Sequence, residues 1–167
     1  MLYNIIYHSP LGGIKITSTD SELKSLCFSA EPVDVNGYVP PIVQEAMSWL
    51  DSFFNGKEPP TRPAMSPEGT EFQLRVWNEL LKLKWNERIT YGELARRVGS
   101  HPRAVGQAVG CNPLPLFIPC HRIVSANGIG GYTPGIELKM RLLDLESSGD
   151  NAGNYVSAPA HQPRLPL

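Results

Sequence analysis

Three side chains that could do chemistry stand in consecutive positions, Cys120, His121 and Arg122, between two apolar runs. A cysteine is a good nucleophile only as the thiolate, and an unperturbed thiol, with a pKa of about 8.5, is mostly protonated at neutral pH. His121 can accept that proton directly or through a water, and a carboxylate elsewhere would fix its tautomer. The alternative is that Cys120 is a small buried apolar residue and His121 a core histidine.

The composition indicates a globular chain of 167 residues, which is enough for one domain or two small ones sharing a core. No apolar run approaches the length of a membrane span, and the first residues lack the pattern of a signal peptide, so we expect a soluble, cytoplasmic protein. The three cysteines form no CxxC pair, and the four histidines are scattered. Neither a disulfide framework nor a metal site is therefore expected.

The net charge of −1 hides an asymmetry along the chain. Residues 1–69 contain four Lys or Arg and eight Asp or Glu, whereas residues 70–146 contain ten and seven. The excess of basic residues therefore lies in the part that contains Cys120. This suits a partner with a phosphate backbone, although an ordinary solvated surface would explain so small an excess equally well.

The first 66 residues predict a small scaffold domain. Turn-forming segments separate three short strand patterns, which indicates an antiparallel sheet. Its apolar positions are Ile5 and Tyr7, Ile14 and Ile16, and Leu26 and Phe28. A helical pattern then begins at Pro41 and ends at Asn55-Gly56, and one such helix can cover one face of the sheet. A proline-rich connection follows, and we place the domain boundary there.

Residues 67–147 predict a mostly helical second domain. Thr70 and Gln73 form a capping-box pattern, and Thr90 and Glu93 repeat it at the start of a shorter helix that stops at Gly99. Pro102 is a favoured first residue for the next helix, which ends at Gly110. Two short helices around a turn resemble a DNA-binding helix-turn-helix. The fold class expected is therefore α+β, with a flexible tail at residues 148–167.

The second helix of this pair carries mostly small side chains, with Arg103 at its start. A helix that reads the major groove would usually carry several long polar side chains. This helix could instead approach DNA closely without reading sequence, with Arg103 free to enter a vacated position in the base stack. A tightly packed core helix with a surface arginine is the alternative.

Five motifs together are similar to the O6-alkylguanine-DNA alkyltransferase family. They are Arg103-Ala104-Val105-Gly106, Asn112-Pro113, residues 118–124, Gly131-Tyr132 and residues 139–146. The resemblance is specific over residues 70–146 and looser in the N-terminal part. It implies repair of double-stranded DNA by irreversible transfer of an alkyl group from O6 of guanine to the protein's own cysteine, with O4 of thymine left open. It further implies one turnover per molecule, no cofactor and no obligate protein partner.

The resemblance also assigns roles to residues. In the catalytic roles that it implies, Cys120 accepts the alkyl group, His121 acts as the base through a water, and Glu146 orients that base. Tyr91 donates a hydrogen bond to the guanine, and Asn112 braces the active-site turn. The DNA-binding residues are Arg103, Ala104, Gly106, Tyr91 and Arg122. The substrate pocket is formed by Ile123, Tyr132, Thr133 and Pro134.

These roles agree with the chemistry, because the target carbon lies on a base inside a stacked duplex. The nucleotide must be rotated out at a cost of a few kcal/mol, and a wedge side chain entering from the minor groove can keep the duplex open. Pro134 stands where the family commonly has glycine, which leaves the range of adducts open. Cys111 is expected to be a small packing residue rather than a second thiol at the site.

Other classes of function remain. A lesion-binding relative without catalysis would have another residue in place of Cys120. A helix-turn-helix regulator is disfavoured by the small side chains of its recognition helix. A Cys-His hydrolase would turn over repeatedly and would not need the helix pair.

Overall fold

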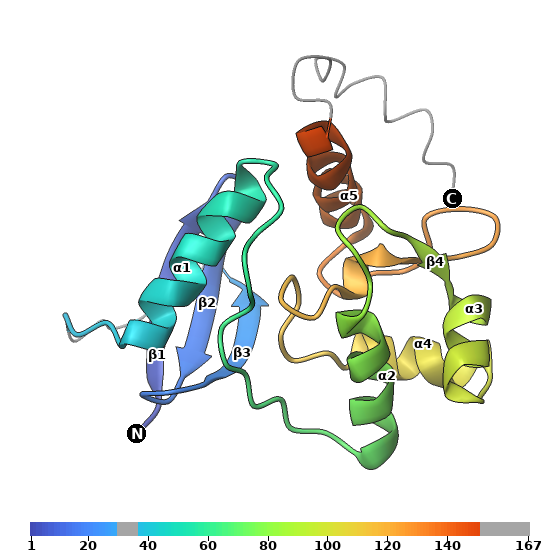
Figure 1. Cartoon of the computed structure of the whole chain (residues 1–167), viewed down its shortest axis with the longest axis horizontal. Coiled ribbons are helices and arrows are strands. Elements are labelled where there is room, and N and C mark those ends of the chain that lie inside the picture. The colour runs from blue at the N-terminus through green and yellow to red at the C-terminus, as the bar shows by residue number, and fades with distance from the viewer. Residues whose placement is uncertain (30–36, 151–167) are drawn as a thin grey trace.

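The computed structural model describes residues 1–29 and 37–150, the side chains of the last two excepted. Its architecture is α+β, as predicted, with the sheet and one helix on one side and the remaining helices on the other (Figure 1). The elements are β1 (Tyr3–Ser9), β2 (Gly12–Ser18), β3 (Leu23–Phe28), α1 (Pro41–Phe54), α2 (Glu71–Leu81), β4 (Ile89–Thr90), α3 (Tyr91–Val98), α4 (Pro102–Gly110), the 3-10 turn η1 (Cys120–Arg122), β5 (Ile123–Val124) and α5 (Ile136–Asp150).

The N-terminal sheet is antiparallel, in the order β1-β2-β3. Ile5 pairs with Ile16, which in turn pairs with Leu26, so the alternating apolar residues share one face. Helix α1 covers that face (Figure 1). It begins at Pro41, whose fixed φ suits a first helical residue, and its C-cap is Asn55, as the sequence predicts.

The connection between α1 and α2 is attached to the sheet. The amide of Leu23 donates to the carbonyl of Ala64, and the amide of Ser66 donates to the carbonyl of Leu23, both at 2.9 Å. The buried apolar side chains of the sheet, α1 and the helical part form one cluster. The two parts therefore share a core, and the division at residue 66 stays a prediction.

Helix α2 begins with the predicted capping box, in which Thr70 and Gln73 satisfy each other's amides. At the start of α3 only half of the second box forms. Thr90 accepts from the amide of Glu93, but the Glu93 carboxylate binds Arg96 and Arg97 instead of reaching back. Two nearby guanidinium groups attract a carboxylate more strongly than one amide does.

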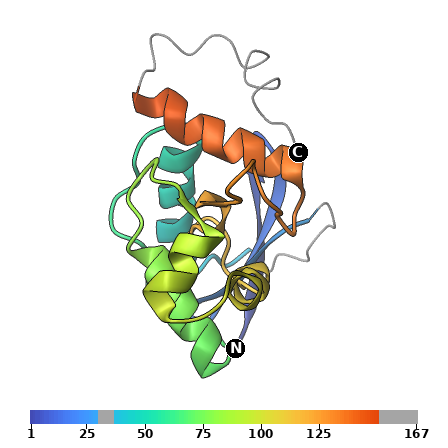
Figure 2. The same cartoon turned by 90° about the vertical axis from the view of Figure 1, so that its right-hand side faces the viewer.

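Helices α3 and α4 pack against each other as a helix-turn-helix, and α4 is seen end-on in Figure 2. Helix α3 ends at Gly99, whose φ of 67° is left-handed and favours glycine. Helix α5 crosses the top of the molecule in the same view. It continues to Asp150, so the first three residues of the predicted tail are helical, and residues 151–167 lie outside the described residues.

A two-stranded parallel pair that the sequence did not predict joins distant parts of the helical region. Ile89 of β4 pairs with Ile123 of β5, and Thr90 pairs with Val124. Because α3 starts directly after β4, and β5 directly follows the turn with the cysteine, the pair brings Tyr91 close to Cys120.

Among residues 1–29 and 37–150, no helix is long and apolar enough to cross a membrane.

Candidate active site

Cys120 opens the turn η1 and is 6% exposed. Asn112 holds the chain that leads into this turn: its side-chain nitrogen donates to the carbonyl of Ile118 at 2.7 Å, and its side-chain oxygen accepts from the amide of Leu114 at 2.9 Å. The amide of Cys120 also donates to the carbonyl of Ile118, at 2.7 Å. Asn112 therefore fixes the backbone on which the thiol stands.

The surroundings of Cys120 favour the neutral thiol over the thiolate. Burial raises the pKa of Cys120, although the side chain of Asn112 and the ammonium group of Lys139 act in the opposite direction. Since only the thiolate is a strong nucleophile, the site needs a group that accepts the proton.

His121 and Glu146 lie behind the thiol, and both side chains are fully buried. The Nε2 atom of His121 contacts the carboxylate of Glu146, which also accepts from Nε of Arg122 at 2.8 Å and from the amide of Asn86 at 3.0 Å. One carboxylate from α5 thus holds both residues that follow Cys120.

The charges of this pair favour a neutral imidazole beside an ionised carboxylate. Burial by itself would raise the pKa of Glu146, but His121 and Arg122 lower it to about 2. Burial lowers the pKa of His121, against the attraction of Glu146. With Nε2 donating to Glu146, the lone pair of Nδ1 is free to accept a proton, and Nδ1 has no hydrogen-bond partner among the described residues.

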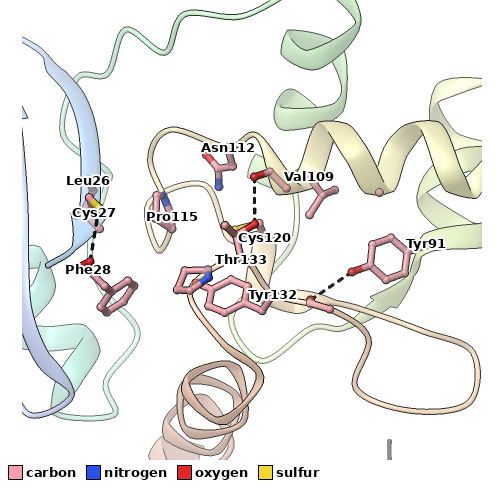
Figure 3. Close-up of a pocket in the computed structure, with 14 residues that line it drawn as sticks. Leu26, Cys27, Phe28, Tyr91, Val109, Asn112, Pro115, Cys120, Tyr132 and Thr133 are labelled. Carbon is pink, nitrogen blue, oxygen red and sulfur yellow. Dashed lines mark hydrogen bonds between the residues drawn. The ribbon is translucent and has the colours of Figure 1, made fainter.

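The thiol faces a cavity of about 530 Å³ (Figure 3). Tyr91 lies on the far side from the sheet, and its hydroxyl donates to the carbonyl of Gly131 at 3.4 Å. Burial raises the pKa of Tyr91, so the phenol keeps its proton as a donor. The cavity is lined by Leu26, Cys27, Phe28, Tyr91, Gly106, Val109, Gly110, Asn112, Pro115, Cys120, Gly131, Tyr132, Thr133 and Pro134.

Three of the four residues predicted to form the pocket line this cavity: Tyr132, Thr133 and Pro134. The hydroxyl of Thr133 donates to the carbonyl of Gly110 at 3.2 Å, which ties the loop to the end of α4. Ile123 is not among the residues that line the cavity, and its side chain is fully buried because β5 carries it into the core beside β4. The resemblance implied a contact through the main chain near Ile123, and that contact stays a prediction.

The residues predicted to meet DNA lie mostly on α4. Arg103 is exposed near its start, and Ala104 and Gly106 are partly buried. A Cβ atom on Gly106 would stand 3.8 Å from the ring of Tyr91, so the helix and the phenol are close neighbours. One wall of the cavity is therefore formed by the second helix of the helix-turn-helix.

Arg122 does not fit its predicted place on the DNA-binding surface. It is 3% exposed, donates to Glu146 and to the carbonyl of Leu83, and lies 5.7 Å from the ring of Trp85. The tight turn buries three consecutive residues, and a buried guanidinium requires such partners.

Cys111 is not the packing residue that the sequence predicted, since it is exposed at the end of α4.

Lys139 is a site residue that the sequence reasoning did not identify. It is fully buried, and its ammonium group donates to the carbonyls of Ile123 and Gly131. Burial lowers its pKa to about 8, and Cys120 opposes that shift. A signal was present, because Lys139 and Glu146 stand seven residues apart on the same face of α5 as the apolar Leu143.

Comparison with known proteins identifies the class. Residues 71–148 match the family described as 6-O-methylguanine DNA methyltransferase, DNA binding domain. A methylated-DNA–protein-cysteine methyltransferase of Metallosphaera sedula is 42% identical over 147 residues, 85% of this chain and 91% of that protein.

Solved structures give the same result. The O6-methylguanine methyltransferase of Mycobacterium tuberculosis superposes with a TM-score of 0.76 and 32% identity, covering 89% of this chain and 94% of that one. A structure of the M. tuberculosis protein in complex with DNA superposes with a TM-score of 0.75 at 34% identity, over 86% and 92% of the two chains. This chain therefore belongs to the methylated-DNA–protein-cysteine methyltransferase family.

Proposed function

We propose that this protein repairs alkylated DNA by moving the alkyl group from O6 of a guanine to Cys120. The observation that carries the proposal is that residues of α4, the phenol of Tyr91 and the thiol of Cys120 line one cavity. The residue after the cysteine, His121, contacts the carboxylate of Glu146. A base turned out of a duplex would therefore meet a donor on one side and a nucleophile on the other.

The helix-turn-helix would bind the duplex and open it. The exposed position of Arg103 on α4 supports a role in filling the gap left by the extruded nucleotide. The small side chains of Ala104 and Gly106 let the helix approach the DNA closely. Since few long polar side chains are present to read base edges, recognition would depend on the lesion rather than on the surrounding sequence.

The chemical step is a displacement at the alkyl carbon. Cys120 loses its proton toward Nδ1 of His121 through a bridging water, and Glu146 stabilises the imidazolium that forms. The sulfur then forms a bond to the alkyl carbon while the carbon–O6 bond breaks. Guanine leaves with that electron pair and takes up one proton, which balances the proton lost by the thiol. The hydroxyl of Tyr91 donates to the leaving base and stabilises its developing charge.

The product is a thioether, which neither His121 nor Glu146 can hydrolyse. Each protein molecule would therefore act once, and no cofactor enters the scheme. Methyl groups are the alkyl groups that we expect the protein to transfer. The range of larger adducts depends on Pro134, which fixes φ and removes one amide donor from the pocket wall.

The test is intact-mass measurement and peptide mapping after mixing the protein with a duplex that contains O6-methylguanine. A gain of one methylene, mapped to Cys120 and saturating at one per protein, is expected. The variant Cys120→Ser should bind the duplex without gaining mass. Tight lesion binding by the unsubstituted protein without any mass gain would instead favour a damage-binding protein, and absence of both would refute the proposal.

A further inference from the structure

The segment that leads into Cys120 is held from outside by the N-terminal part of the chain. The amide of Leu26 in β3 donates to the carbonyl of Pro113 at 2.8 Å. The Nε atom of Arg62, in the connection after α1, donates to the carbonyl of Phe117 at 2.5 Å. Phe117 stands three residues before Cys120. Residues 113–119 are therefore fixed on one side by Asn112 and on the other by the sheet and the connection.

Trp49 of α1 contacts both the connection next to Arg62 and the acceptor residue Phe117. The indole of Trp49 donates to the carbonyl of Pro60 at 3.1 Å, and the same indole packs on the ring of Phe117 with centroids 4.5 Å apart. The connection and the active-site segment thus share one aromatic anchor from α1. The backbone near Arg62 and the acceptor residue Phe117 are therefore held by the same side chain.

The guanidinium of Arg62 also belongs to the charge cluster behind the thiol. It lines a small cavity of about 100 Å³ together with Arg122. Burial and the like charge of Arg122 lower the pKa of Arg62, and Glu146 opposes that shift. The buried carboxylate of Glu146, which holds His121, therefore also attracts the guanidinium of Arg62.

We propose that Arg62 is a positioning residue for alkyl transfer, so that the N-terminal part is more than a scaffold. This inference rests on the function proposed above. By binding the carbonyl of Phe117, Arg62 keeps the backbone before Cys120 in the position from which the sulfur atom can reach the alkyl carbon. Misplacement of a reacting atom by about 1 Å can cost on the order of 100-fold in rate. No residue of α4 lines the small cavity to which Arg62 belongs, so the loss of Arg62 should leave DNA binding unchanged.

The experiment compares Arg62→Met, Arg62→Lys and the control Lys57→Met. Lys57 is an exposed cation in the same connection, which matches the loss of charge without the contact. The single-turnover rate at saturating O6-methylguanine duplex and the dissociation constant for that duplex are measured separately. We expect Arg62→Met to slow transfer by about 10- to 100-fold, with the dissociation constant within about twofold. Arg62→Lys, which keeps one donor and the charge, should recover most of the rate.

An unchanged saturating rate in Arg62→Met would overturn the proposal, as would an equal loss of rate in Lys57→Met. Amide hydrogen exchange supplies a readout that does not depend on the reaction. The amides of Ile118 and Cys120 are hydrogen-bonded within the segment and should exchange faster in Arg62→Met, whereas those of α4 should not. If the unsubstituted protein gained no mass, the proposed function would fail, while the exchange data would still test the positioning.

Discussion

The carboxylate of Glu146 and the imidazole of His121 meet in the core, although the two residues stand 25 positions apart and neither side chain is exposed. Arg122 shares the same carboxylate. Glu146 therefore carries out two tasks with one charge, since it neutralises a buried guanidinium and fixes the tautomer of the imidazole.

The variant Glu146→Gln should slow alkyl transfer by about 100-fold, because an amide cannot stabilise the imidazolium that forms when His121 accepts the thiol proton. The measurement is the single-turnover rate on methylated duplex. Glu137→Gln, at an exposed position of the same helix, is the control and should react normally. Equal rates in the two variants would show that Glu146 has no part in the reaction.

Glu146 should also make the fold sensitive to acid. Its pKa is about 2 in the folded protein against an ordinary value of 4.5, so its stabilising effect is fully present above pH 4.5 and is lost as the pH falls toward 2. The shift corresponds to about 3 kcal/mol. Urea unfolding from pH 6 to pH 2.5 should therefore show that the difference in unfolding free energy between the unsubstituted protein and Glu146→Gln narrows. A constant difference would contradict the shift.

Lys139→Met should move the titration of the Cys120 thiol to higher pH, because the nearby ammonium group favours the thiolate. The measurement is the rate of Cys120 alkylation by iodoacetamide against pH, in a background where the exposed Cys27 and Cys111 are serine. Arg141→Met, which removes an exposed cation from the same helix, should leave the titration unchanged. An identical curve for Lys139→Met would mean that the ammonium group does not act on the thiol.

Arg103→Ala should slow repair of a fully paired duplex by about 10-fold or more, but should affect a single-stranded substrate much less. The reason is that a single strand does not require the base to be unstacked and unpaired. Single-turnover rates on the two substrates give the ratio directly. The same loss on both substrates would assign Arg103 to general phosphate binding rather than to the gap in the stack.

Much of the fold could be predicted from short sequence patterns that mark the ends of helices. The capping box at Thr70 and Gln73, the proline at position 41 and the left-handed Gly99 mark helix ends through contacts within a few residues, and the structure has those ends. The family and the fold class, which the motifs predicted, are confirmed. The second capping box formed only in part, because Glu93 found arginines one turn further along the helix.

The residue placements that could not be predicted from the sequence depend on contacts with residues far away in the chain. Nothing local marks Arg122 as buried, because its acceptors on Glu146 and Leu83 come from other elements. Arg62 meets Phe117 across 55 positions, and no periodicity links them. The pairing of β4 with β5 is two residues long in each strand, too short for an alternating pattern to stand out.

That short parallel pair has a consequence for how the site can change. The separation between Tyr91 and Cys120 is set by main-chain bonds between Ile89, Thr90 and the residues of β5, which do not depend on side-chain identity. Substitutions in β4 and β5 that keep the residues apolar should leave the two reactive groups in place. Inserting or deleting one residue there would shift the register and separate them. The site should therefore tolerate apolar substitutions in β4 and β5 far better than insertions or deletions in these strands.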